Sequence, residues 1–156
     1  MVVRSMMPAD APAIHGIHSA CLECSLLGRY TREQITAWMT GRTPQGYLRA
    51  SEAGERFFVA EENGVTVGFA SWQDTQLLSA FVHPDFQGRG TGSALVSACF
   101  EDATRMGATI SSVRAVSGAE PFYHRHGFQI VGSGSTSKHG VIIQDTQMHR
   151  ATCEKK

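Results

Sequence analysis

The sequence predicts an α+β (mixed α/β) fold, in which a mixed, mostly antiparallel sheet of six to seven strands is flanked by about four helices. Apolar segments at 57–60 and 65–70 flank Asn63-Gly64, a dipeptide that strongly favours a two-residue hairpin turn. A third apolar segment, at 75–82, precedes a glycine-rich turn and a long amphipathic pattern. This order indicates a strand that leads into a helix.

Before the hairpin, the sequence predicts one short strand and two helices. The apolar segment Val2 to Met6 is typical of a strand. Asp10 is a common N-cap residue, and the apolar residues that follow it recur at helical spacing over 10–24. Thr31 to Gln34 has the form of a capping box and predicts the start of the second helix. Residues 42–54 fit either a loop or one short helix.

Downstream of the glycine-rich turn, a helix with a wide apolar arc should pack on the sheet. β-branched residues predict a strand at 109–115, so the strand, helix and strand form a right-handed crossover between parallel strands. Residues 119–126 predict a short helix that ends at Gly127. Two closing strands separated by a flexible Gly/Ser-rich turn are expected at 129–131 and 141–149, with the turn at 132–137.

Composition and charge narrow the classes of function. Fourteen basic and fourteen acidic side chains give a formal net charge of zero, and the local basic cluster is Lys155-Lys156. Nucleic-acid and anionic-membrane binding need a basic surface, so we expect neither partner. No apolar segment approaches the ~20 residues of a membrane span, and the N-terminus lacks a signal-peptide pattern. We expect a cytoplasmic protein with a single domain over 1–150, which is long enough to bury one core, and a frayed tail over 151–156.

The cysteines and histidines form no metal-site pattern. Four cysteines in a chain of this size suit a reducing compartment better than a disulfide framework. Cys21 and Cys24 form a C-x-x-C, but a zinc ribbon needs a second such pair. Both fall on the apolar arc of the first helix, so we expect buried thiols and no bound metal. His15 and His18 lie on or beside its polar side, where we expect solvated side chains.

The segment from Gln87 to Gly92 indicates a ligand site. Its three glycines allow the backbone to approach a ligand, and a helix N-terminus offers unpaired N–H groups and the positive end of the helix dipole. This combination binds phosphate, although a plain tight turn is the alternative. The segment is not a P-loop, because no lysine lies between Met1 and Gln129, and Leu95 replaces the third glycine of a dinucleotide fingerprint.

Two motifs resemble those of the GNAT superfamily of acyl-CoA-dependent N-acetyltransferases. Gln87, Gly90 and Gly92 match its Gln/Arg-x-x-Gly-x-Gly/Ala signature, and the preceding Phe81 to Phe86 segment is similar to the family's strand with its following proline and aromatic residue. Ala119 to Phe128 is similar to the family's A-x-x-F-Y-x-x-x-G-F pattern. The motifs occur in the family's order.

The resemblance implies a GNAT fold whose sheet is splayed in the middle to admit acetyl-CoA as a co-substrate. Backbone N–H groups of the glycine-rich segment would bind the CoA pyrophosphate, with side-chain donors from Gln87 and Arg89. The backbone near Phe81 and Val82 would pair with the pantetheine arm, and the Val82 amide would face the thioester carbonyl. The implied cofactor-binding residues are Phe81, Val82, Gln87, Gly88, Arg89, Gly90, Thr91, Gly92, Phe122 and Tyr123.

The resemblance also suggests catalytic residues. Tyr123 occupies the position of the family's general acid, although an aromatic that only packs on the pantetheine is the alternative. Several members carry a Glu or His at the position that aligns with Gln76, and glutamine cannot take a proton. Asp74, two residues earlier and expected on the same strand face, could act as the base through water, and a surface aspartate at a strand start is the alternative. Val116 replaces a family asparagine, which puts one CoA contact in doubt.

The implied reaction is direct attack of a primary amine on acetyl-CoA in a ternary complex, with a small molecule as the favoured acceptor. By resemblance, Tyr30, Trp38 and Gln76 are candidates for the acceptor pocket, and ordinary core residues are the alternative for the two aromatics. The absence of a carboxylate at Gln76 motivates a rival from another class, a non-catalytic acyl-CoA-binding sensor. A protein or peptide amine acetyltransferase is a third hypothesis. The sequence does not decide whether the protein forms a homodimer.

Overall fold

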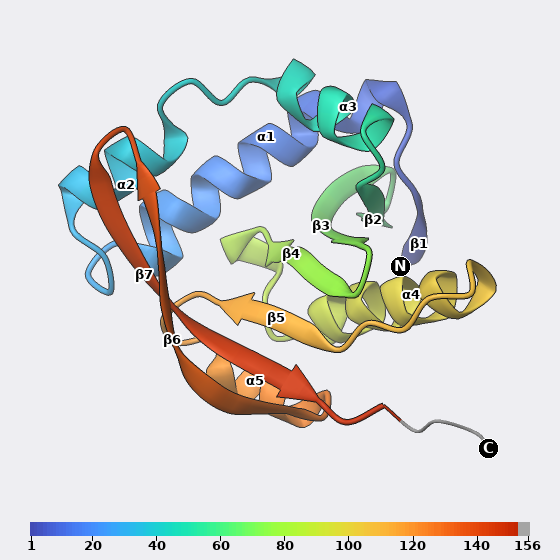
Figure 1. The fold of residues 1–156 in the computed structure, drawn as a ribbon. Helices are drawn as coiled ribbons and strands as arrows, with labels where there is room; N and C mark the ends of the chain where they lie inside the picture. Colours follow the sequence, from blue (N-terminus) through green and yellow to red (C-terminus); the bar gives the residue numbers. More distant parts are fainter. Residues whose placement is uncertain (153–156) are drawn as a thin grey trace.

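A computed structural model of the chain describes residues 1–152, and the last four residues of the tail predicted to fray lie outside this description (Figure 1). One sheet of seven strands has the order β1-β2-β3-β4-β5-β7-β6. Neighbouring strands are antiparallel except β4 and β5, which are parallel. The mixed sheet and the parallel crossover are therefore confirmed. The strands are β1 Val2–Ser5, β2 Arg56–Glu62, β3 Val65–Gln73, β4 Gln76–Val82, β5 Ser112–Ala115, β6 Phe128–Lys138 and β7 Val141–Arg150.

Five α-helices surround the sheet. The predicted capping box is confirmed, because Thr31 Oγ1 accepts from the Gln34 amide at 3.1 Å and the Gln34 side chain accepts from the Thr31 amide at 2.9 Å. The undecided segment 42–54 forms a helix that starts at a proline, which is preorganised for the first turn. The helices are α1 Ala11–Ala20, α2 Arg32–Met39, α3 Pro44–Glu52, α4 Thr91–Arg105 and α5 Glu120–Arg125.

Both faces of the sheet's N-terminal half are buried, because alternate residues of β2 pack on opposite layers. Phe57 and Val59 join α1 and α3 in one cluster, whereas Phe58 and Ala60 join α4 in another. Figure 1 shows α1 and α3 on one side of these strands and α4 on the other. Asp102 of α4 accepts from Arg56 of β2 at 2.6 Å and from the Trp72 indole of β3 at 3.0 Å, which anchors the helix to the sheet.

The sheet is splayed between β4 and β5. These strands pair only at Gln76 with Ser112 and at Leu77 with Val113, so the rest of β4 has an unpaired edge. The splay begins beside a bulge in β4, where Leu77 pairs with Trp72 but Ser79 pairs with Ser71, leaving Leu78 as the extra residue. A bulge bends a strand away from its neighbour, and bulges are frequent next to active sites.

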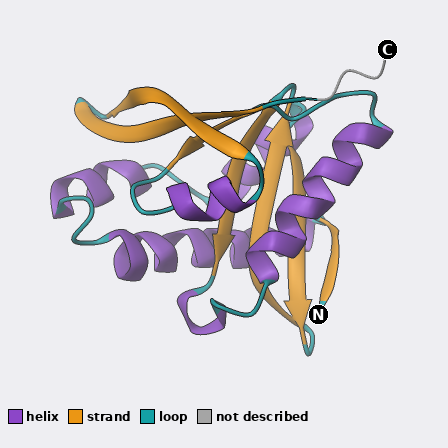
Figure 2. Ribbon diagram, turned by 90° about the horizontal axis from the view of Figure 1, so that it is seen from below, coloured by secondary structure: helices purple, strands orange, loops and turns teal. Residues whose placement is uncertain are grey.

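The Gly/Ser-rich segment 132–137 was expected to be a flexible turn, and this prediction is wrong. The segment lies within β6 and pairs along β7, and the chain reverses at His139-Gly140, where φ is 50° and 78°. A Cβ at Gly134 would lie 2.5 Å from Asp145 Oδ1, so the small residues make room for side chains of β7. The long β6–β7 hairpin extends over α2 (Figure 2).

The first helix also departs from the sequence prediction. After Ala20 the chain continues as a π-helix over Cys21–Leu26. Because π geometry turns less per residue than an α-helix, Cys21 stays buried but Cys24 is exposed. His18 is buried rather than solvated: its Nδ1 lies 2.9 Å from the Tyr47 hydroxyl, and burial lowers its pKa to about 3.

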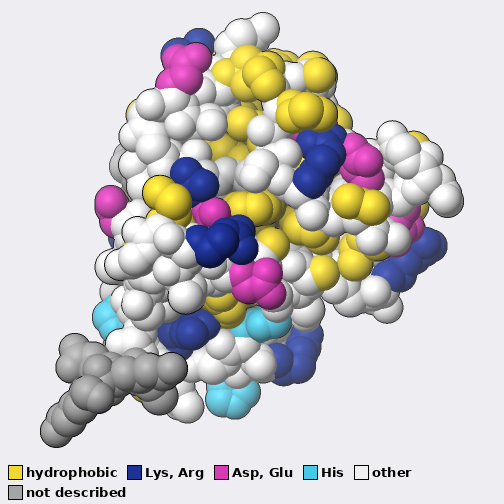
Figure 3. All heavy atoms as spheres, turned by 90° about the vertical axis from the view of Figure 1, so that its right-hand side faces the viewer, with side chains coloured by type: hydrophobic (Ala, Val, Ile, Leu, Met, Phe, Trp, Pro, Cys, Tyr) yellow, Lys and Arg dark blue, Asp and Glu magenta, His cyan; other side chains and the backbone are white. Residues whose placement is uncertain are grey.

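Acidic and basic side chains are interspersed on the face shown in Figure 3, in keeping with the zero formal net charge. Among the helices of residues 1–152, none combines the length and apolar character that crossing a bilayer requires.

Candidate active site

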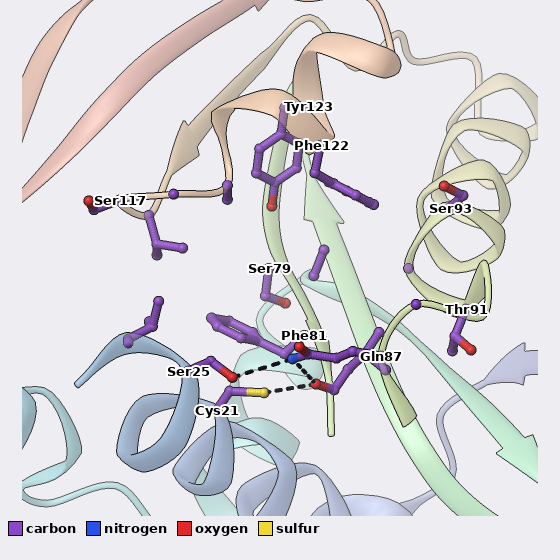
Figure 4. Close-up of a pocket in the computed structure, with 18 of the residues that line it drawn as sticks. Cys21, Ser25, Ser79, Phe81, Gln87, Thr91, Ser93, Ser117, Phe122 and Tyr123 are labelled. Carbon is purple, nitrogen blue, oxygen red and sulfur yellow. Dashed lines mark hydrogen bonds between the residues drawn. The ribbon is translucent and has the colours of Figure 1, made fainter. Parts of the chain in front are cut away.

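A cavity of about 430 Å³ opens where β4 parts from β5 (Figure 4). It is bounded by the unpaired edge of β4, the glycine-rich segment, the start of α5 and the π-helical turn. Of the residues predicted to bind the cofactor, all but Arg89 line it. The lining residues that the sequence predicted are Phe81, Val82, Gln87, Gly88, Gly90, Thr91, Gly92, Phe122 and Tyr123.

The glycine-rich segment presents unpaired donors to this cavity. Gly88 and Gly90 have φ of 78° and 80°, a left-handed conformation that side chains disfavour, and Gly90 is the N-cap of α4. The ladder of α4 begins with Ala94 N–H donating to the Gly90 carbonyl at 3.1 Å, so the amides before Ala94 have no partner within the helix. Thr91 Oγ1 is also buried without a protein partner in residues 1–152. These donors fit a diphosphate.

Gly92 lets the first turn of α4 approach α5. A Cβ at this position would lie 3.1 Å from the Phe122 ring, a contact tighter than ordinary packing. Phe122 in turn packs edge-on against Tyr123 with ring centroids 5.1 Å apart. The two sequence motifs therefore meet at one wall of the cavity.

The backbone of Val82 lies at the splayed edge. The His83 amide donates to the Val67 carbonyl of β3 at 2.8 Å, and neighbouring amides of an extended strand point to opposite edges, so the Val82 amide points away from β3. The Val82 carbonyl accepts from Cys21 Sγ at 3.1 Å and from Gln87 Nε2 at 3.0 Å. The Gln87 side chain therefore holds the loop against the strand instead of extending a donor outward.

The Arg89 side chain points elsewhere. Its guanidinium donates to Glu62 at 3.3 Å and lies 5.2 Å from the centre of the Phe86 ring. The expectation that it lines the phosphate site is not met in this structure, because the neighbouring carboxylate and aromatic ring hold it outside the cavity lining.

Tyr123 is positioned by aromatic neighbours. Its side chain is 6% exposed, and its ring packs edge-on against Phe122 and Phe128, the latter with centroids 5.9 Å apart. In Figure 4 its hydroxyl points into the cavity. Burial raises the pKa of the phenol above its ordinary value, so the side chain is protonated at neutral pH.

The structure does not bring Asp74 or Gln76 into this cavity. Asp74 lies in the exposed turn between β3 and β4 with φ of 56°, and β4 begins only at Gln76. The interpretation that Asp74 shares a strand face with Gln76 is therefore wrong, because a turn residue has no place in the alternation of the strand. Both residues lie at the end of β4 opposite to Val82.

The two aromatic candidates for the acceptor pocket also lie outside the cavity. Tyr30 is 2% exposed, and its hydroxyl donates to the Gln144 carbonyl at 2.8 Å and accepts from the Ser117 amide at 2.9 Å. Trp38 packs edge-on against Tyr30 at 5.4 Å and lines a separate hollow of about 360 Å³ beside Lys138. Tyr30 has the contacts of a core residue that joins β7 to the loop before α5.

Sequence reasoning missed several lining residues. The π-helical turn contributes Cys21 and Ser25, whose positions follow from a helical geometry that has no distinct sequence signal. Ser79 of β4 faces the cavity because of the bulge at Leu78. Arg125 lies inside the Phe-Tyr motif and could have been proposed from its place there.

Comparisons with known proteins agree with this site. A family model of the acetyltransferase (GNAT) domain matches residues 26–150. The chain is 30% identical over 139 residues to the L-amino acid N-acyltransferase MnaT of Escherichia coli (strain K12), covering 81% of this chain and 76% of the relative. A GCN5-related N-acetyltransferase structure from Rhodopseudomonas palustris is similar with a TM-score of 0.88 and 29% identity, covering 97% of this chain and 95% of that one.

A further similar structure was solved with a ligand. YncA from Salmonella typhimurium, with its cofactor acetyl-CoA, has a TM-score of 0.73 and 25% identity over 100% of this chain and 96% of that one. The splayed sheet and the paired motifs thus define an acyl-CoA-dependent N-acetyltransferase. The chain belongs to the GNAT superfamily.

Proposed function

We propose that this protein transfers the acetyl group of acetyl-CoA to the primary amine of a small, amino-acid-like acceptor by direct attack in a ternary complex. The unpaired edge of β4 supports this proposal most directly, because it lies between the glycine-rich segment and the Tyr123 hydroxyl. The Val82 amide on this edge is directed away from β3. The relative MnaT is named as an L-amino acid N-acyltransferase, which supports an amino acid as the class of acceptor.

The residues divide the chemistry between binding and proton transfer. Amides at the start of α4 would bind the diphosphate, and the edge of β4 near Phe81 would pair with the pantetheine arm. As the amine forms the new C–N bond, the Val82 amide would stabilise the developing oxyanion. Breaking of the C–S bond releases a thiolate, and Tyr123 would donate its proton to that sulfur.

The proton transfer from Tyr123 depends on close positioning. A phenol has a reference pKa near ~10 and a thiol near ~8.5, and burial raises that of Tyr123 further, so donation to a free thiolate is uphill. The step stays uphill, and it is accessible only because the hydroxyl is held at the sulfur as negative charge develops there. The packing of Tyr123 against Phe122 and Phe128 fixes the ring for this role.

Cys21 lines the cavity but is unsuited to form an acyl-enzyme. Burial raises the pKa of its thiol to about 12, and the thiol donates to the Val82 carbonyl, so thiolate is scarce at neutral pH. We expect Cys21→Ala to keep kcat within about threefold, because direct attack needs no protein nucleophile. With acetyl-CoA and no amine, rapid-quench measurements should show no stoichiometric release of thiol. Release in the parent that disappears in the variant would instead establish a covalent route.

An acceptor panel tests the proposed reaction. Thiol release from acetyl-CoA is measured with the L-amino acids, simple alkylamines and short peptides, and mass spectrometry identifies the acetylated product. We expect turnover with one or more L-amino acids and little with alkylamines. Acetyl-CoA binding without thiol release across the panel would favour a non-catalytic acyl-CoA sensor. Thiol release with peptides alone would favour a peptide amine acetyltransferase.

A further inference from the structure

A chain of hydrogen bonds leads from the cavity to a half-buried carboxylate. Ser79 of β4 lines the cavity, and its Oγ lies 2.6 Å from the Oγ of Ser71 on β3. Ser71 is fully buried and donates to Glu55 Oε2 at 2.5 Å. Glu55 immediately precedes β2, so three consecutive segments of the sheet each contribute one member.

The direction of these hydrogen bonds follows from the number of protons available. An ionised carboxylate only accepts, and a hydroxyl has a single proton to donate. Because Ser71 donates to Glu55, it must accept from Ser79. The Ser79 oxygen then keeps lone pairs that can accept a hydrogen bond from the cavity. The chain is therefore oriented to receive a proton from a bound group and to pass it toward Glu55.

Ser79 faces the side of the cavity away from α4. It is on the same face of β4 as Phe81, two residues on, and Phe81 packs in the α1 and α3 layer rather than with α4. Figure 4 shows Ser79 between Tyr123 and Phe81, which line the same cavity. The glycine-rich segment belongs to the start of α4, so Ser79 lies on the face opposite to the helix that would bind the cofactor.

We propose that Ser79, Ser71 and Glu55 form the proton-accepting chain for the amine, in the place of the carboxylate that Gln76 lacks. The inference rests on the proposed acyl transfer. An N–H bond of the amine breaks as an O–H bond forms at Ser79, the Ser79 proton moves to Ser71, and the Ser71 proton moves to Glu55 Oε2. One proton is transferred in total, and no further reactant is needed. Ser79 contacts the substrate, whereas Ser71 and Glu55 act through it.

The surroundings of Glu55 suit a proton acceptor. Burial raises its pKa, while the hydrogen bond from Ser71 and the positive charge of Arg42 oppose that rise. The Tyr47 phenol also faces it, and burial raises the pKa of that phenol, so it stays neutral. Since the carboxylate must be ionised to accept, activity should rise with pH through the Glu55 pKa. The partly exposed side chain can then return the proton to solvent.

Glu55→Gln tests the hydrogen-bond chain with little change in the shape of the side chain. The amide oxygen still accepts from Ser71 but cannot take a proton. With acetyl-CoA and the L-amino acid of highest turnover in the panel, we expect kcat to fall by about 10-fold or more. The KM for acetyl-CoA and the melting temperature should stay near those of the parent, and the acid limb of the pH profile should disappear. Glu52→Gln, an exposed residue of α3, is the matched control and should keep the parent profile.

Variants of the serines separate a relay from a structural role. Ser79→Ala should lower kcat to a similar extent, and the Ser79→Ala/Glu55→Gln double variant should lose little more, because both changes interrupt one pathway. Unchanged kcat in Glu55→Gln, or a loss that leaves the acid limb in place, would overturn the proposal. A larger loss in Asp74→Asn than in Glu55→Gln would also overturn it. If the parent protein acetylates no amine, the proposed function is wrong, and the proton-accepting role of Ser79, Ser71 and Glu55 is then wrong as well.

Discussion

Tyr123→Phe should lower kcat by about 10² or more, because the variant keeps the ring and loses the proton that the leaving thiolate requires. The interaction is made mainly in the transition state, so the affinity for acetyl-CoA should change little. Phe122 and Phe128 still contact the remaining ring, and we expect the melting temperature to stay close to that of the parent. Steady-state kinetics together with calorimetric titration of acetyl-CoA check both parts.

The pH profile reports when the Tyr123 phenol ionises. Burial raises the pKa of the phenol, so the acid form persists through the range in which a free tyrosine would ionise, near ~10. The parent should therefore show no fall in activity from this group below that pH. A kcat in Tyr123→Phe equal to that of the parent would show that the side chain is only a wall of the cavity, and that water or another residue supplies the proton.

Sequence reasoning succeeded where the structure depends on local signals. Asn63-Gly64 sets the β2–β3 turn, and Thr31 with Gln34 caps α2. The glycine-rich segment is predicted from three glycines within five residues, and the positive φ at Gly88 and Gly90 is the conformation that glycine favours. Each of these features involves residues within a few positions of one another, so a single sequence contains the whole signal.

The failures involve contacts between distant residues. Gly134 looks like part of a flexible turn until Asp145 of β7 is placed beside it, and only then do its size and pairing indicate a strand. The π-helical turn that exposes Cys24 gives no pattern distinct from an α-helix. Glu55 and Ser79 are joined through Ser71, and neither spacing nor composition indicates that connection.

Gly90→Val should weaken acetyl-CoA binding by about 10² or more while the fold persists. Gly90 has a φ of 80°, which costs a residue with a side chain about 1–2 kcal/mol, and β-branched valine fits it poorly. Among residues 1–152, no atom lies within 4 Å of a Cβ added there, so the variant should fold. The loop must either adopt another conformation, which redirects the amides at the start of α4, or carry a side chain at the rim of the phosphate site. Gly92→Val is less informative, because its Cβ would meet Phe122.

Gly107→Val provides the matched control for Gly90→Val at the other end of α4. Gly107 has a φ of 75°, and an added Cβ would have no neighbour within 4 Å in the described part of the chain. The substitution therefore introduces a comparable backbone strain far from the amides of the first turn. Both variants should lose a similar amount of thermal stability, measured by melting temperature. Calorimetry should show parent-like acetyl-CoA affinity for Gly107→Val alone. Equal affinity in Gly90→Val and the parent would remove the phosphate-binding role of the segment, because the strained loop would then have changed without any effect on the ligand.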